Sequence, residues 1–124
     1  MRVLVVDDFA TMRKIVKNVL KQINIENVVE AENGKHALNV LKSEEVDLII
    51  SDWMMPEMTG IEFLKVCKDD DEKKKIPFIM VTAEGQKESV MEAIKSGVDN
   101  YIVKPFTPEK LKDAIDKARA RAGK

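Results

Sequence analysis

The sequence predicts an α/β domain in which helices cover both faces of a five-stranded parallel sheet. Five short apolar runs alternate with five stretches that have helical periodicity. The connections between the runs are long enough to hold crossover helices, so neighbouring strands are expected to be parallel. Runs such as Phe78-Ile79-Met80-Val81 are apolar throughout, which is typical of strands buried on both faces. Together these observations predict a doubly wound sheet.

The expected strands are runs of mainly β-branched residues. They cover about residues 2–6, 27–31, 47–51, 77–81 and 99–103. The charged run at 68–75, just before the fourth strand, predicts a solvated loop.

Between the strands, apolar residues recur every three or four positions, the spacing of one helix face. The first helix is indicated by Met12, Ile15, Val16, Val19, Leu20 and Ile23. The second and third are indicated by Ala37, Leu38 and Leu41, and by Ile61, Leu64 and Cys67. The fourth has Val90, Ala93 and Ile94, with Gly97 as its C-terminal stop. The last has Leu111, Ala114, Ile115 and Ala118, entered through the cap Thr107-Pro108.

Composition narrows the classes of function. The 124 residues suffice for one domain, so we expect residues 1–124 to form a single domain with no output domain after it. The formal net charge is −1 and no basic block pairs with aromatic residues, which argues against nucleic-acid binding. No apolar stretch approaches the ~20 residues that span a bilayer, and no signal peptide is expected. The single cysteine fits a reducing, intracellular setting.

Polar residues follow four of the expected strands at the point where each ends. Asp7 and Asp8 follow the first strand, Asp52 the third, Thr82 the fourth and Lys104 the fifth. The carboxyl ends of parallel strands share one edge of the sheet, where open α/β folds place their ligands. We therefore expect three carboxylates, a hydroxyl and an ammonium group to converge at this edge.

This set of groups predicts a magnesium-dependent phosphoryl-transfer site. Packed carboxylates repel one another, and a divalent cation removes that cost. Magnesium prefers such hard oxygen ligands. Asp52 stands alone at the end of a central strand, so it is the best candidate for a nucleophile that forms an acyl phosphate. Lys104 and the Thr82 hydroxyl would neutralise and position the transferred group.

At this point the sequence closely resembles the receiver domains of two-component response regulators, over essentially the whole chain. The resemblance rests on the motifs VVDDF, SDW-MP-MTG, MVTAEG and YIVKPFTP, in the family's order and spacing. The stretch VDDFATMRKIV and the Asp52-Trp53 pair are most similar to stand-alone chemotaxis regulators. The resemblance implies a flavodoxin-like (βα)5 fold with strand order 2-1-3-4-5; that order is carried over from the family.

The resemblance also implies roles at the site. Asp52 would accept a phosphoryl group from the phosphohistidine of a histidine kinase, with Mg²⁺ as the cofactor. Asp7 and Asp8 match the metal-binding acidic pair, and the backbone carbonyl of Trp53 would complete the protein ligands together with Asp52. Thr82 and Lys104 match the residues that contact the phosphoryl group.

Further roles are implied for the switch and the output surface. Tyr101 matches an aromatic switch whose ring turns inward when Thr82 is drawn towards the phosphoryl group. The Lys104-Pro105 bond is expected to be cis. The output surface would be the fourth helix, fifth strand and fifth helix, and would include Lys87, Tyr101 and Lys110.

Two positions are expected to tune dephosphorylation. Met54 lies two residues after the acceptor, where chemotaxis relatives often carry Asn. A thioether cannot orient an attacking water as an amide does, so we expect a longer-lived acyl phosphate. Glu84, two residues after Thr82, matches the chemotaxis pattern.

The predicted function is a phosphorylation-activated signalling switch, which catalyses only its own phosphorylation and dephosphorylation and is not an enzyme in the usual sense. The resemblance implies a CheA-like histidine kinase, a flagellar motor switch protein as target and possibly a dedicated phosphatase. It also implies a cytoplasmic monomer that binds neither nucleic acid nor membrane.

Two alternatives stay open at this stage. The chain is compatible with a phosphorelay or a pathway that does not end at a motor. A magnesium-dependent phosphatase that works through an aspartyl phosphate is the alternative from another class. Such an enzyme would be expected to carry a second Asp two residues after its nucleophile, where this chain has Met54. A flavin or dinucleotide site is disfavoured because the first strand–helix turn reads DDF and has no glycines.

Overall fold

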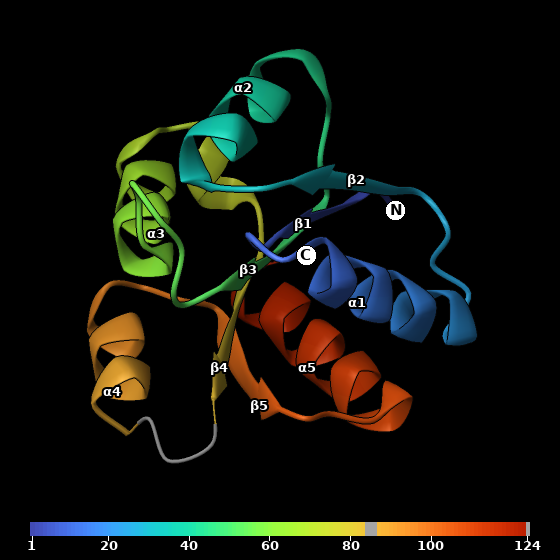
Figure 1. Cartoon of the computed structure of the whole chain (residues 1–124). Coiled ribbons are helices and arrows are strands. Elements are labelled where there is room, and N and C mark those ends of the chain that lie inside the picture. The colour runs from blue at the N-terminus through green and yellow to red at the C-terminus, as the bar shows by residue number, and fades with distance from the viewer. Residues whose placement is uncertain (84–86, 124) are drawn as a thin grey trace.

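Strands and helices alternate along the whole chain in the computed structural model, which describes residues 1–83 and 87–123 (Figure 1). The strands are β1 (Val3–Val6), β2 (Val28–Ala31), β3 (Leu48–Asp52), β4 (Phe78–Ala83) and β5 (Asn100–Lys104). The α-helices are α1 (Ala10–Gln22), α2 (Gly34–Ser43), α3 (Gly60–Asp69), α4 (Lys87–Lys95) and α5 (Pro108–Arg121). Within the described ranges, no helix is both long and apolar enough to cross a membrane.

The five strands form one parallel sheet in the order β2-β1-β3-β4-β5, as expected. β1 and β3 pair at the centre of the sheet, with Val6 in register with Ser51. On the far side of β3, Asp52 is in register with Val81 of β4. The carboxyl ends of β1, β3, β4 and β5 therefore lie along one edge, which is the edge predicted to hold the site.

Helices cover both faces of the sheet: α1 and α5 lie on one side, and α2, α3 and α4 on the other (Figure 1). The core on the α1 and α5 side includes Val3, Val5, Leu48, Ile50, Ile79, Val81 and Leu111. The core on the other side includes Leu4, Val6, Ile49, Phe78 and Met80 with Phe63 of α3. Alternate residues of each strand thus enter opposite cores, which explains the uninterrupted apolar runs.

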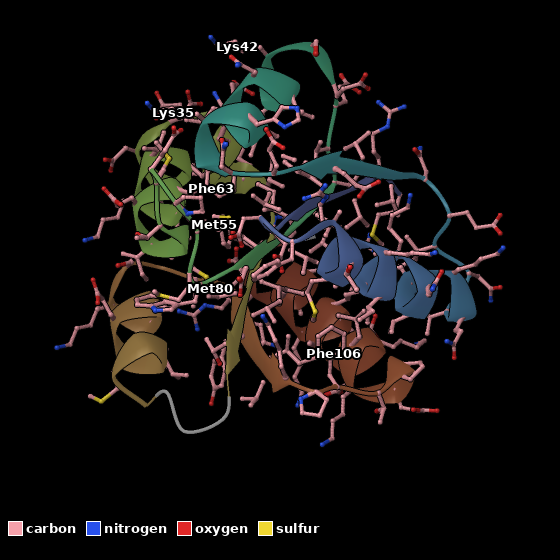
Figure 2. The ribbon with its side chains drawn as sticks, viewed as in Figure 1. Lys35, Lys42, Met55, Phe63, Met80 and Phe106 are labelled. Carbon is pink, nitrogen blue, oxygen red and sulfur yellow. The ribbon has the colours of Figure 1, made fainter. Side chains whose placement is uncertain are left out.

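Side chains of both cores are labelled in Figure 2. Met55, Phe63 and Met80 belong to the core under α3, where the Phe63 and Phe78 rings are tilted with centroids 5.5 Å apart (Figure 2). Phe106 packs against the core on the α1 and α5 side. Lys35 and Lys42 of α2 extend outwards into solvent (Figure 2).

The strands end later than the apolar pattern predicted. β3 includes Asp52, β4 continues through Thr82 to Ala83, and β5 includes Lys104. The ladder continues at these residues, with Thr82 in register with Val103 and Ala83 with Lys104. Backbone pairing does not depend on side-chain polarity, so the strands extend beyond their apolar stretches. The backbone at Asp52, Thr82 and Lys104 is therefore held by the sheet itself.

The charged run at 68–75 is more ordered than the loop that we expected. Its first two residues finish α3, and Lys73–Lys75 form a short 3₁₀ helix. The Asp70 carboxylate accepts hydrogen bonds from the backbone N–H groups of Glu72 and Lys73 at 2.9 and 3.0 Å. Aspartate favours such local turns, so the run is exposed to solvent as predicted, but the prediction that it forms only a loop was wrong.

Candidate functional site

Three carboxylates gather at the carboxyl edge of the sheet. One oxygen each from Asp7, Asp8 and Asp52 lies within 4.8 Å of the other two. Asp7 follows β1 directly and Asp52 ends β3, so the pairing of these central strands brings them together. Asp7 and Asp52 are buried, whereas Asp8 is exposed. The structure thus brings together the three acids that the sequence singled out.

A fixed cation lies beside this cluster. The Lys104 ammonium Nζ is 3.1 Å from Asp52 Oδ1. Burial raises the pKa of the Asp52 carboxyl above its usual range, and the charge of Lys104 counteracts part of that rise. The group carries three potential negative charges and one positive charge, so ionisation of all three acids leaves a net charge of −2.

Of the three acids, Asp7 has the ionised form that its surroundings disfavour most. Burial is the main cause, and the nearby charge of Asp52 adds to it, so that the pKa of Asp7 rises to about 6. The Phe9 backbone N–H donates a 2.9 Å hydrogen bond to Asp7 Oδ1 and limits the rise. The metal-free site is therefore under electrostatic strain near neutral pH.

These residues fit a divalent cation. In an octahedral magnesium site with bonds of about 2.1 Å, ligand oxygens lie about 3 to 4 Å apart. The separations of at most 4.8 Å among the three acids need only small inward movements to reach that spacing. The donors are hard oxygens, and a charge of +2 would offset the net charge of the group. The geometry, the donor chemistry and the charge of this cluster are therefore all compatible with a bound divalent cation.

Thr82 is fully buried, and its hydroxyl has no hydrogen-bond partner among the residues that the structure describes. A buried hydroxyl without a partner costs free energy, on the order of 1–3 kcal/mol. Thr82 lies one residue beyond Val81, which pairs with Asp52, so it lies next to the acceptor on the neighbouring strand. A hydroxyl in this state is poised to accept a new partner.

The sheet divides the site residues between its two faces. Asp52 lies two residues after Ile50, and Lys104 lies two residues after Ile102. Each therefore shares a strand face with an isoleucine of the core on the α1 and α5 side. Thr82 lies two residues after Met80, which belongs to the opposite core, so the two share a face of β4. Tyr101 of β5 is in register with Met80. Thr82 and Tyr101 therefore belong to the face covered by α3 and α4. Tyr101 is 38% exposed.

The loop after Asp52 is held close to the acceptor. The Gly60 N–H donates a 2.9 Å hydrogen bond to the Trp53 carbonyl, and α3 starts with a capping box between Thr59 and Glu62. One lone pair of the Trp53 carbonyl is thus already engaged by α3. We therefore base the candidate metal site on the three carboxylates, and the Trp53 carbonyl as a metal ligand stays an untested prediction.

The remaining predicted residues lie around this centre. Met54 is 67% exposed after β3, and the Lys104-Pro105 bond is cis, as expected. Lys110 is exposed in the first turn of α5, and Lys87 is the first residue of α4. Glu84 lies outside the described residues.

Sequence reasoning missed Arg13. Its Nη1 donates a 2.6 Å hydrogen bond to the backbone carbonyl of Asp7, and its Nε is 3.0 Å from Glu30 Oε1. The only sequence signal was a cation near the start of α1, where the helix dipole disfavours positive charge.

Comparison with known proteins agrees with this geometry. The family model "Response regulator receiver domain" matches residues 3–116. Chemotaxis protein CheY-3 of Vibrio cholerae is 48% identical over 94% of this chain and 90% of its own length. Chemotaxis protein CheY of Pseudomonas aeruginosa is 45% identical over 94% of each protein. The solved structure of chemotaxis response regulator CheY4 of Vibrio cholerae superposes with a TM-score of 0.83, at 36% identity over 94% of this chain and 97% of that one. The chain therefore belongs to the response regulator receiver domain family and is similar within it to chemotaxis regulators of the CheY type.

Proposed function

We propose that this chain is a phosphorylation-activated switch in which Asp52 accepts a phosphoryl group from a histidine kinase. The observation that carries the proposal is the combination of a buried acceptor with partner groups of three kinds: carboxylates, an ammonium group and a hydroxyl. Asp52 has two further carboxylates within 4.8 Å and an ammonium group at 3.1 Å, and an unpartnered hydroxyl follows its partner on β4. These groups supply candidate metal ligands, a candidate acceptor and a charge-neutralising cation, which supports the proposal.

In the proposed reaction, an Asp52 oxygen forms a bond to phosphorus as the N–P bond of the donor phosphohistidine breaks. The electron pair of that bond returns to the imidazole nitrogen. Mg²⁺, held by Asp7, Asp8 and Asp52, would supply positive charge for the phosphoryl oxygens and keep the carboxylates ionised. Lys104 already favours the ionised form of Asp52, and it gains a second anionic partner in the phosphoryl group.

The proposed switch follows from the division of residues between the faces of the sheet. Phosphorylation gives the Thr82 hydroxyl an acceptor that it lacks among the described residues. Movement of Thr82 vacates space on the face that it shares with Tyr101, whose ring then turns inward from its exposed position. A local change in charge thereby alters the surface formed by α4, β5 and α5.

We propose that this surface binds a protein partner, with a flagellar motor switch protein as the first candidate. Several large apolar side chains are exposed on the described part of α4 and β5, namely Met91, Ile94, Tyr101 and Val103. A surface of this kind marks a site of protein association. The curated relatives with this architecture are named chemotaxis proteins, which supports a motor-linked partner. Lys87 and Lys110 complete the proposed surface.

Phosphorylation by acetyl phosphate tests the main proposal without a kinase. The wild-type chain should become labelled in the presence of Mg²⁺ and remain unlabelled in EDTA. Asp52→Asn should abolish labelling, whereas Asp69→Asn, which changes an exposed carboxylate at the end of α3, should leave it unchanged. Label that persists in Asp52→Asn would contradict the assignment of the acceptor.

Met54 is the proposed determinant of the lifetime of the phosphorylated state. Its thioether is exposed and has no group that holds a water in line with the acyl phosphate. Met54→Asn should accelerate loss of the phosphoryl group several-fold, while Met54→Leu serves as the apolar control. Equal decay rates in all three proteins would show that this position does not control hydrolysis.

A further inference from the structure

Arg13 connects α1, β2 and the end of β1 through one side chain. Nη1 donates a 2.6 Å hydrogen bond to the Asp7 carbonyl, and Nε lies 3.0 Å from Glu30 Oε1. Glu30 also pairs with Lys17 through its second oxygen, at 3.0 Å. The Arg13 side chain is only 16% exposed, so the guanidinium is held on two sides and shielded from much of the solvent.

The carbonyl that Arg13 holds belongs to the peptide that joins Asp7 to Asp8. These residues supply two of the three carboxylates in the cluster. The Asp7 N–H donates to the Ala31 carbonyl at 3.1 Å, which fixes the chain before the peptide. The Phe9 N–H donates to Asp7 Oδ1, which fixes the side chain. Among the described residues, the contact with Arg13 is the hydrogen bond made by the peptide that joins the two acids.

We propose that Arg13 is a positioning residue for the divalent-cation site. By holding the Asp7–Asp8 peptide, Arg13 keeps both carboxylates aimed at one point and lowers the cost of bringing them together around a cation. Glu30 orients the guanidinium for this task. The inference rests on the proposed function, because it assumes that the three acids bind Mg²⁺.

Charge and geometry make opposite predictions for Arg13. As a nearby cation, the guanidinium repels Mg²⁺, so loss of its charge alone should tighten binding. As a positioning group, it holds the ligands in place, so its loss should weaken binding. Groups that orient metal ligands typically contribute about 10- to 100-fold in affinity. The sign of the change in affinity therefore separates the two roles.

Lys17 offers a matched control on the same helix. It shares the partner Glu30 with Arg13, yet no hydrogen bond joins it to Asp7 among the described residues. Lys17→Met removes one positive charge and one ion pair with Glu30, and it leaves the Asp7 carbonyl with its partner. Arg13→Met removes charge and hydrogen bond together. Arg13→Lys keeps the charge but lacks the planar fork that reaches two acceptors at once.

The experiment is a Mg²⁺ titration followed by the fluorescence of Trp53, the only tryptophan, which lies next to Asp52. Urea unfolding in EDTA is measured on the same proteins. We expect Arg13→Met to weaken Mg²⁺ binding about tenfold. Arg13→Lys should weaken it several-fold, and Lys17→Met should leave it unchanged or slightly tighter.

The outcomes are distinguishable. Unchanged or tighter binding by Arg13→Met would overturn the inference, whatever happens to its stability. Equal weakening by Arg13→Met and Lys17→Met would overturn it too, since the effect would then belong to Glu30 alone. If Arg13→Met does not fold, Arg13→Lys decides by the same criterion. Absence of Mg²⁺ binding in the wild type would instead refute the proposed function.

Discussion

A methyl group added at Gly60 should disturb both the fold and the acceptor. Gly60 is the first residue of α3, and a Cβ atom there would lie 2.3 Å from the Asp52 carbonyl oxygen. It would also lie 3.0 Å from the Trp53 Cα and 2.9 Å from the Met80 Sδ. Two of these three atoms belong to the backbone, so a side-chain rotation cannot relieve the overlap.

Gly34→Ala provides a control of the same chemical type. Gly34 is the first residue of α2, and the three nearest neighbours of a Cβ atom there would all be Met58 side-chain atoms: Sδ at 2.6 Å, Cγ at 2.8 Å and Cβ at 3.0 Å. The flexible thioether end of this side chain can rotate aside. Both substitutions change glycine to alanine at the first position of a helix, so the difference between them reports the backbone overlap.

Overpacking that forces a backbone to move typically costs about 1–3 kcal/mol. We expect Gly60→Ala to lose about 2–3 kcal/mol of unfolding free energy, and Gly34→Ala less than about 1 kcal/mol. Urea unfolding at constant pH measures both values. Labelling by acetyl phosphate should slow in Gly60→Ala, because the displaced carbonyl belongs to Asp52. A Gly60→Ala protein as stable as Gly34→Ala would refute the reasoning.

Three other outcomes are expected. The pKa of the Asp7 carboxyl is about 6 in the folded protein and 3.8 as the ordinary value. Between pH 3.8 and 6, the folded state therefore carries a proton on Asp7 that the unfolded state has lost. The contribution of Asp7 to the stability of the metal-free protein should thus be greatest below pH 4 and should fall by at most about 3 kcal/mol as the pH rises through 6. Urea unfolding in EDTA should show this fall in the wild type and not in Asp7→Asn; parallel curves would contradict it. Lys104→Met should tighten Mg²⁺ binding several-fold yet slow labelling by acetyl phosphate, and looser binding would show that Lys104 does not oppose the metal. Asp99 accepts hydrogen bonds from Lys68 Nζ at 2.9 Å and from the Phe78 N–H at 2.8 Å, so Asp99→Asn should cost about 2 kcal/mol. Urea unfolding of Asp99→Asn checks that figure, and a cost below about 0.5 kcal/mol would contradict it, while a double-mutant cycle with Lys68→Met isolates the share of the ion pair.

The architecture was predictable because each strand carries its own signal. An apolar run such as Phe78–Val81 needs cover on both faces, and a parallel sheet with helices on both sides supplies it. The gathering of Asp7, Asp52 and Lys104 followed from the same reasoning, since parallel strands place their carboxyl ends together. Strand ends were less predictable, because pairing continues through polar residues such as Thr82.

Other features were beyond the reach of a single sequence. The contact between Arg13 and the Asp7 carbonyl depends on how α1 leans against β2, and no local pattern encodes that angle. The close approach of Gly60 to Asp52 depends on the path of a loop, so the glycine looked like an ordinary start of a helix. The turn at Asp70 was not predicted because its neighbours are highly charged, and a run of charged residues is typical of a solvated loop. Each of these is a contact between elements or within a loop, where residue identity constrains geometry weakly.

The distribution of Asp52 and Tyr101 over opposite faces of the sheet has an evolutionary consequence. Residues exposed on the side of α4 and β5 contact neither the acidic cluster nor its cation in any hydrogen bond or ion pair among the described residues. Substitutions of exposed residues on this side that lie outside the proposed Thr82–Tyr101 switch need not alter how fast the acceptor gains or loses its phosphoryl group. On this arrangement, a duplicated copy of the gene can gain a new binding partner through changes on the α4 and β5 side while the rates at the acceptor stay the same.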